Sequence, residues 1–154
     1  SETAWQAILP PDEVLTKTAY EWNTESIPAG YYLLRVEASD ELSNPEGRAL
    51  RHSRTTPPIV IDNDPPRFRL LEGRGRRIAG RVVDDFSPIG SIEYSLDGRT
   101  WHPVFSSDSL FDSSEESFSF DLPATLSAGP HTVAVRAHDG ARNQATGRVA
   151  ITIP

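Results

Sequence analysis

The stretch that decides the fold is AGYYLLRVEASDELSN at Ala29–Asn44, because a related stretch, AGPHTVAVRAHDGARN, occurs at Ala128–Asn143. In both copies apolar residues alternate with polar ones after an Ala-Gly pair, and an Asp then precedes an Asn by four positions. Alternation with a period of two is typical of a β-strand with one buried face. A repeat of about 100 residues has the size of one β-sandwich and is too long for a solenoid repeat. The sequence therefore predicts an all-β chain of two tandem sandwiches.

The second sandwich, residues 67–154, shows the complete strand pattern. Asp97-Gly98 is the strongest hairpin signal in the chain and joins its third and fourth strands. We expect seven short strands, separated by turns. They are Arg67–Leu71, Arg77–Val83, Ser91–Leu96, Trp101–Phe105, Phe118–Leu122, His131–Ala137 and Arg148–Ile153.

The first unit, residues 1–62, matches only the later part of this pattern. The matching segments are Trp5–Ile8 with Trp101–Val104, Tyr20 and Trp22 with Phe118 and Phe120, and Tyr32–Ala38 with His131–Ala137. A fourth strand should bend or restart at Pro57-Pro58 before Ile59, because two prolines cannot lie in a central strand. Counterparts of the first three strands are missing. The remaining edge and apolar face are expected to recruit another polypeptide.

Residues 63–66 are expected to link the two sandwiches. Asp64-Pro65-Pro66 should be extended, because proline fixes its own φ and disfavours the helical region for the preceding residue. The two units should therefore lie end to end with a small interface.

Composition excludes several classes of function. The 22 acidic and 15 basic residues give a net charge of −7, which disfavours nucleic acid as a partner. No apolar run approaches the roughly 20 residues of a membrane span, and no cysteine is present for disulfides or thiolate ligands. The serines of Ser106–Ser119 lack a G-x-S-x-G elbow, and Gly73-Arg74-Gly75 lacks the rest of a phosphate loop. We expect a chain that is not an enzyme.

Acidic turns are the best candidates for a site. Calcium takes six to eight oxygen ligands, which Asp and Asn at loop ends can supply. The alternative is that these side chains cap their own turns, and the lack of an EF-hand loop favours it. We therefore expect no cofactor, with calcium as the alternative. The candidate ligands are Asp62, Asp64, Asp84, Asp85, Asp139 and Asn143.

Aromatic residues occupy equivalent positions in the two units. Trp5 matches Trp101, and Trp22 matches Phe120. Equivalence in both copies indicates packing, since each unit must bury the same face. Stacking of a carbohydrate on exposed rings is the alternative.

Residues Ile27–Ala38 (IPAGYYLLRVEA) resemble the corner before a late strand in fibronectin type III and related bacterial immunoglobulin-like domains. The resemblance implies that the Tyr32 hydroxyl bonds to the upstream backbone. His131 stands at the matching position of the second copy, and we expect that its imidazole cannot reach the same acceptor. Residues Ile92–Trp101 (IEYSLDGRTW) and the link Ile61–Pro66 resemble bacterial tandem arrays of such modules.

The resemblance implies a non-catalytic spacer or protein-interaction module of a larger secreted or cell-envelope bacterial protein. The alternatives are a carbohydrate- or calcium-binding accessory module attached to an enzyme, and the periplasmic sandwich of a sensor. Alignment of the two units places Ser1 opposite Asp97, at a hairpin tip, where proteolysis concentrates. We therefore expect a cleaved precursor whose upstream part stays bound and supplies the missing strands.

Overall fold

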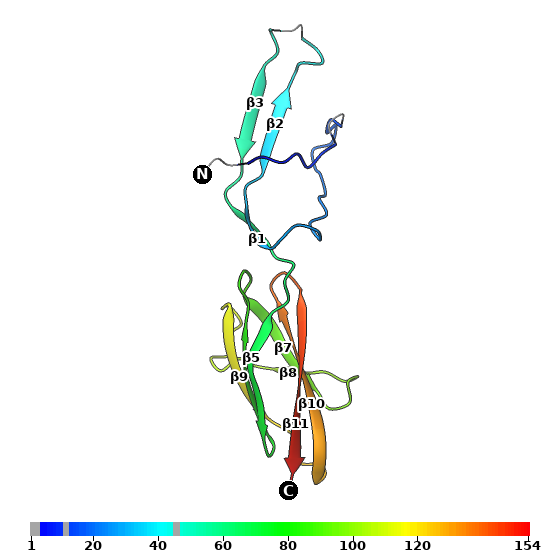
Figure 1. The fold of residues 1–154 in the computed structure, drawn as a ribbon, viewed down its shortest axis with the longest axis vertical. Coiled ribbons are helices and arrows are strands. Elements are labelled where there is room, and N and C mark those ends of the chain that lie inside the picture. Colours follow the sequence, from blue (N-terminus) through cyan, green and yellow to red (C-terminus); the bar gives the residue numbers. More distant parts are fainter. Residues whose placement is uncertain (1–3, 11–12, 45–46) are drawn as a thin grey trace.

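The chain is all β in a computed structural model that describes residues 4–10, 13–44 and 47–154. Figure 1 shows its strands in two groups, joined by the link at residues 62–66. The part of the chain that the structure describes holds no helix of the length and apolar character that a membrane crossing requires. The strands are β1 (Gly30–Tyr32), β2 (Arg35–Ser39), β3 (Arg51–Thr55), β4 (Ile59–Ile61), β5 (Arg67–Arg74), β6 (Arg77–Val83), β7 (Ile89–Ser95), β8 (His102–Val104), β9 (Glu115–Asp121), β10 (Gly129–Asp139) and β11 (Gln144–Ile153).

Residues 67–154 form two antiparallel sheets with one apolar core between them. The sheets have the strand orders β5-β6-β9 and β11-β10-β7-β8. All seven strands predicted for this region are present, with ends that differ by a few residues. The core takes side chains from both sheets. Its fully or almost fully buried members include Ile78, Val82, Phe118, Ile89, Ile92, Val133 and Val135.

Strand β5 also lies against β11 of the other sheet, with little space between the two. A Cβ atom at Gly73 would lie 2.3 Å from the Ile151 side chain, and one at Gly147 would lie 2.7 Å from Leu71. Glycine at these two positions therefore allows the strands to approach closely. The two strands run in the same direction, away from the link (Figure 1).

The alternation of Ile92, Tyr94 and Leu96 predicts that Leu96 faces inward, and this prediction is wrong. Leu96 is 36 % exposed, whereas Ser95 is 1 % exposed. Strand β7 ends at Ser95, and the chain turns there. The Ser95 hydroxyl accepts a hydrogen bond from the Gly98 amide at 2.9 Å and donates one to Asp97 at 3.0 Å. The alternation of the strand therefore stops one residue earlier than predicted.

Asp97 should titrate well below an ordinary aspartate. Hydrogen bonds from the Thr100 and Arg99 amides, both 2.8 Å long, and then from Ser95 lower its pKa. The unfolded chain has the higher pKa of about 3.9. The stabilising contribution is therefore present above that value and is lost as the pH falls. A carboxyl-carbon NMR titration should give a midpoint below that of the same residue in the urea-unfolded chain, and equal midpoints would contradict this.

Residues 4–61 form two separate two-stranded ribbons, β1 with β4 and β2 with β3. The strands predicted at Trp5–Ile8 and around Tyr20–Trp22 are wrong, because these residues form no strand. A strand must pair its backbone groups with a neighbour, and the described part of this region offers no sheet to join. Alternation of apolar and polar residues was therefore not sufficient for strand formation in these segments.

The strand predicted at Tyr32–Ala38 is divided into β1 and β2. Leu34 lies in the gap, where its amide bonds to the Thr56 hydroxyl at 3.0 Å and its carbonyl accepts the Thr56 amide at 2.8 Å. The facing segment is interrupted by Pro57-Pro58 between β3 and β4. The predicted restart of that strand after the two prolines is confirmed.

The link has no regular secondary structure, and the two regions follow one another along the long axis of the molecule (Figure 1). The Asn63 side chain donates hydrogen bonds to the carbonyls of Thr24, at 2.7 Å, and Ile27, at 2.8 Å. The ring of Tyr31 meets that of Phe86 edge to face, with centroids 6.2 Å apart. These contacts attach the N-terminal region to the sandwich.

Candidate metal centre

Three carboxylates converge where the link enters the sandwich. Oxygen atoms of Asp62, Asp84 and Asp139 all lie within 4.8 Å of one another. Asp62 follows β4, Asp84 follows β6, and Asp139 is the last residue of β10. Strands β6 and β10 both run toward the link, so their ends meet the chain that arrives from β4 (Figure 1).

Local turns fix two of these side chains. Asp84 Oδ1 accepts hydrogen bonds from the amides of Phe86 and Ser87, both at 2.8 Å, as is typical of an Asp that begins a turn. Asp139 Oδ1 accepts the Asn143 amide at 2.8 Å. Asp84 Oδ2 takes no part in its turn hydrogen bonds, whereas Asp139 Oδ2 accepts one from the Asn143 side chain at 2.9 Å.

Asp62 differs from the other two because one of its oxygens has no partner. Asp62 is 9 % exposed, and its Oδ1 accepts the Asp64 amide at 3.2 Å. Its Oδ2 is the one buried polar side-chain atom of the described residues without a hydrogen bond. An unpartnered buried carboxylate oxygen is costly, because burial removes its hydration without replacement.

Among the described residues, no basic side chain forms an ion pair with this cluster of Asp62, Asp84 and Asp139. Burial raises the pKa of Asp62, and repulsion from the other two carboxylates raises it further, although the Ser87 hydroxyl and the Asp64 amide act in the opposite direction. The site therefore favours either a proton or a cation.

Of the six predicted ligands, the structure brings four together. Asn143 joins the three carboxylates, since its Nδ2 donates to Asp139 Oδ2 at 2.9 Å and to the Asp62 carbonyl at 3.1 Å. Two candidates lie elsewhere. Asp85 is bound to Arg67 through both carboxylate oxygens, at 2.8 and 2.7 Å, and Asp64 is exposed.

Ser87 was missed by the sequence analysis. It is 7 % exposed, and its hydroxyl lowers the pKa of Asp62. A signal was present, because Ser87 lies three residues after an Asp that ends a strand, where a turn returns the chain toward that Asp.

The corner hydrogen bond is present in both units. The Tyr32 hydroxyl donates to the Pro28 carbonyl at 2.7 Å. His131 Nε2 donates to the Ser127 carbonyl at 2.8 Å, and Ser127 is the residue that matches Pro28. The expectation that imidazole cannot reach this acceptor is wrong, because Nε2 lies within hydrogen-bond distance of the carbonyl four residues upstream.

The matching tryptophans Trp5 and Trp101 each lie beneath an arginine side chain. The Arg35 guanidinium lies over Trp5 at 4.3 Å, and that of Arg136 lies over Trp101 at 4.1 Å. In each case the arginine covers one face of the indole, which leaves only the other face for a carbohydrate. Phe120 stacks on the Tyr94 ring at 4.5 Å beside the core, and Trp22 is half-buried.

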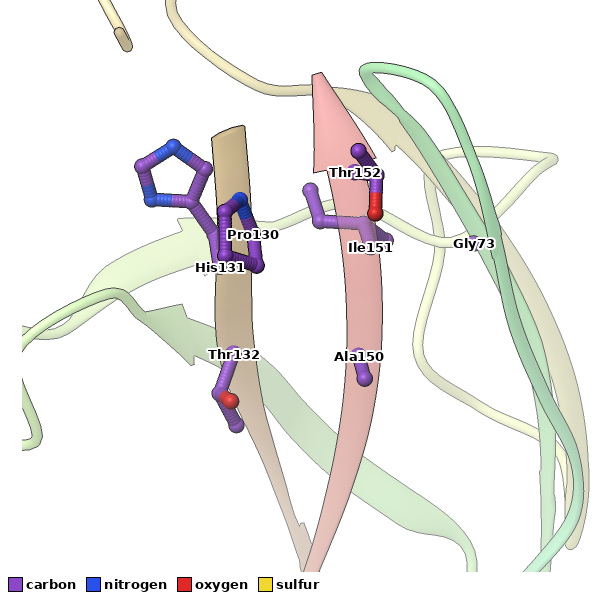
Figure 2. A pocket seen from close by; sticks show the side chains of 7 residues that line it. All are labelled: Gly73, Pro130, His131, Thr132, Ala150, Ile151 and Thr152. Carbon is purple, nitrogen blue, oxygen red and sulfur yellow. The ribbon is translucent and has the colours of Figure 1, made fainter. Parts of the chain in front are cut away.

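Two depressions on the surface of the sandwich can be compared with the geometry that catalysis requires. Figure 2 shows one of about 370 Å³, lined by Gly73 and by neighbouring residues of β10 and β11, where the His131 ring lies apart from Thr152. A larger groove contains Ser91 and His138. Their side chains are 3.4 Å apart, longer than the roughly 2.6–3.2 Å of a nucleophile and its base.

Comparison with known proteins adds no family to this description. No model of a known protein family matches the chain, and a search of curated proteins found no significant match. The carboxylate cluster must therefore be interpreted from its geometry. The function of the two regions must likewise be inferred from their structure.

Proposed function

We propose that the chain is a non-catalytic structural and protein-interaction module. In this proposal residues 67–154 form a self-contained sandwich, and residues 1–62 form part of a second sandwich that another polypeptide segment completes. The completing segment supplies three strands and belongs to the upstream part of the same precursor. We further propose a larger secreted or cell-envelope bacterial protein as the setting, in line with the resemblance to bacterial tandem modules.

The observation that carries the proposal is a difference in burial between matching residues. Val135 on β10 is 0 % exposed, whereas the matching Val36 on β2 is 63 % exposed. Ala137 is likewise 0 % exposed, whereas its match, Ala38, is exposed. The same alternation thus faces a core in one unit and solvent in the other.

The complete unit shows which strands would be needed to bury the apolar face of β2. There β10 pairs with β7, and its inner face packs on the core side chains of β6 and β9. The described residues before Ala29 contain no strand that could do the same for β2. The two-stranded ribbon of β2 and β3 is of a kind that is marginally stable alone.

Other large apolar side chains of residues 4–61 also remain exposed. Exposed apolar surface that gathers in one region is typical of an interaction site. A second sheet packed on the ribbons would bury those side chains that face it. The exposed side chains are Trp5, Ile8, Val14, Leu15, Tyr20, Tyr31, Leu33, Leu42, Leu50 and Val60.

The strand order of the complete unit supports the kind of module proposed. Strands β5, β6 and β9 face β8, β7, β10 and β11. This arrangement corresponds to a three-stranded and a four-stranded sheet of an immunoglobulin-like sandwich. Modules of this architecture carry their functions in surfaces and loops, so the exposed face of the incomplete unit is the natural place for a partner.

The proposal is tested by hydrogen exchange on two forms of the protein. In the 154-residue chain alone, the Val36 amide should exchange much faster than that of Val135. In the longer polypeptide that extends upstream of Ser1, or with that segment added, Val36 should become protected. Val36→Asp should abolish the added segment's binding, whereas Glu37→Gln on the opposite strand face should not.

Two results would contradict the proposal. One is a Val36 amide already as well protected as that of Val135 in the monomeric 154-residue chain. The other is an upstream segment that leaves the exchange of residues 30–61 unchanged.

A further inference from the structure

Three carboxylates at the link are buried close together without a compensating positive charge among the described residues. Asp62, Asp84 and Asp139 are each at most 9 % exposed and lie together without a basic partner among the described residues. Buried charges in proteins are normally paired or bound to a metal ion. Asp62 belongs to this cluster, and its Oδ2 has no hydrogen-bond partner among the described residues.

We propose that Asp62, Asp84 and Asp139 bind one calcium ion at the junction between the link and the sandwich. Calcium–oxygen distances are about 2.3–2.6 Å, so oxygens on opposite sides of one ion lie about 4.6–5.2 Å apart. The three carboxylates offer oxygens within 4.8 Å of one another, which places one ion within reach of all three. Water would complete the coordination.

The donor set selects the kind of metal. All three ligands are carboxylates, and oxygen donors suit calcium, magnesium or manganese rather than zinc or copper. Magnesium requires a tight octahedron with ligands at about 2.0–2.1 Å and keeps most of its waters. Ligands from three separate strand ends, held by different turns, suit the flexible coordination of calcium better.

The ion would act on the link rather than on the sandwich core. Asp62 belongs to the link, whereas Asp84 and Asp139 belong to the sandwich. One ion bound to all three would fasten the chain leaving β4 to the ends of β6 and β10. Asn143 already bridges the same elements by donating to the Asp62 carbonyl and to Asp139. This inference does not depend on a polypeptide that completes residues 1–62.

Calorimetric titration of the chelator-treated 154-residue chain with calcium chloride tests the proposal. We expect one ion per chain, with a dissociation constant of about 10⁻⁵–10⁻³ M. Calcium at about 100 times that value should raise the melting temperature of the sandwich by about 10 °C. Asp62→Asn should weaken binding at least tenfold and remove most of the thermal shift.

The matched control is Asp85→Asn, because Asp85 neighbours Asp84 in sequence but is bound to Arg67 outside the cluster. It should leave calcium affinity unchanged. A wild-type chain without binding heat or thermal shift would overturn the proposal by itself, whether or not the variants fold. Equal losses in Asp62→Asn and Asp85→Asn, or magnesium binding as tight as calcium binding, would overturn the assignment of ligands or of metal.

Discussion

Replacement of Phe118 by alanine is expected to lower the free energy of unfolding of the sandwich by about 3–5 kcal/mol. Phe118 is 2 % exposed and is among the largest fully enclosed side chains. It lies opposite Gly80 in the pairing of β6 with β9, and its ring fills the space over that glycine. A Cβ atom at Gly80 would lie 2.4 Å from the Phe118 ring. The truncated side chain would leave a cavity that the backbone cannot close.

Urea denaturation followed by circular dichroism measures this loss. The matched control is Phe105→Ala, because Phe105 belongs to the same region but is 71 % exposed. The control should change the unfolding free energy by no more than about 0.5 kcal/mol. A loss below about 1 kcal/mol in Phe118→Ala would show that the core has been assigned to the wrong residues.

Val135→Asp and Val36→Asp are expected to differ greatly, although the two valines occupy matching positions of the repeat. Val135 is fully buried, so a carboxylate there would lack both water and a partner, at a cost of several kcal/mol. This is a large share of the roughly 5–15 kcal/mol that stabilises a typical domain. Val36 is exposed, so its substitution should change stability by less than about 0.5 kcal/mol in the chain alone.

Thermal unfolding of the two variants beside the wild-type chain gives the comparison. The Val36→Asp variant also acts as the control for the general effect of an added charge. If both variants lose stability equally, β2 is packed as β10 is, and the first unit needs no completing segment. Once a completing segment is bound, Val36→Asp should become nearly as costly as Val135→Asp.

The strands of residues 67–154 could be predicted because their two faces differ. Along β10, Val133, Val135 and Ala137 are all 0 % exposed, and alternate residues face outward. The same pattern failed at Trp5–Ile8, because alternation shows which face a strand would bury but not whether a neighbouring strand exists. Pairing depends on residues far away in the chain.

The carboxylate cluster was only partly predictable. Strand alternation distinguishes Asp84 from Asp85, since Asp84 continues the inward series of Ile78 and Val82 on β6. Asp139 continues the inward series of β10 in the same way. Asp62 directly follows the buried Ile61, so strand alternation predicts an outward Asp62. Asp62 is nevertheless buried, because the chain leaves the strand there and enters the link. Convergence of the three depends on tertiary structure.

The close approach of β5 and β11 has a mechanical consequence. The link enters the sandwich at the start of β5, and the chain leaves it at the end of β11, at the far pole (Figure 1). Tension along the chain therefore slides these two parallel neighbours past each other lengthwise, instead of peeling one strand away residue by residue. All of their contacts, including Gly73 with Ile151 and Gly147 with Leu71, resist together. Forced unfolding is governed by the unfolding rate, so we expect the sandwich to unfold slowly when it is pulled along this direction.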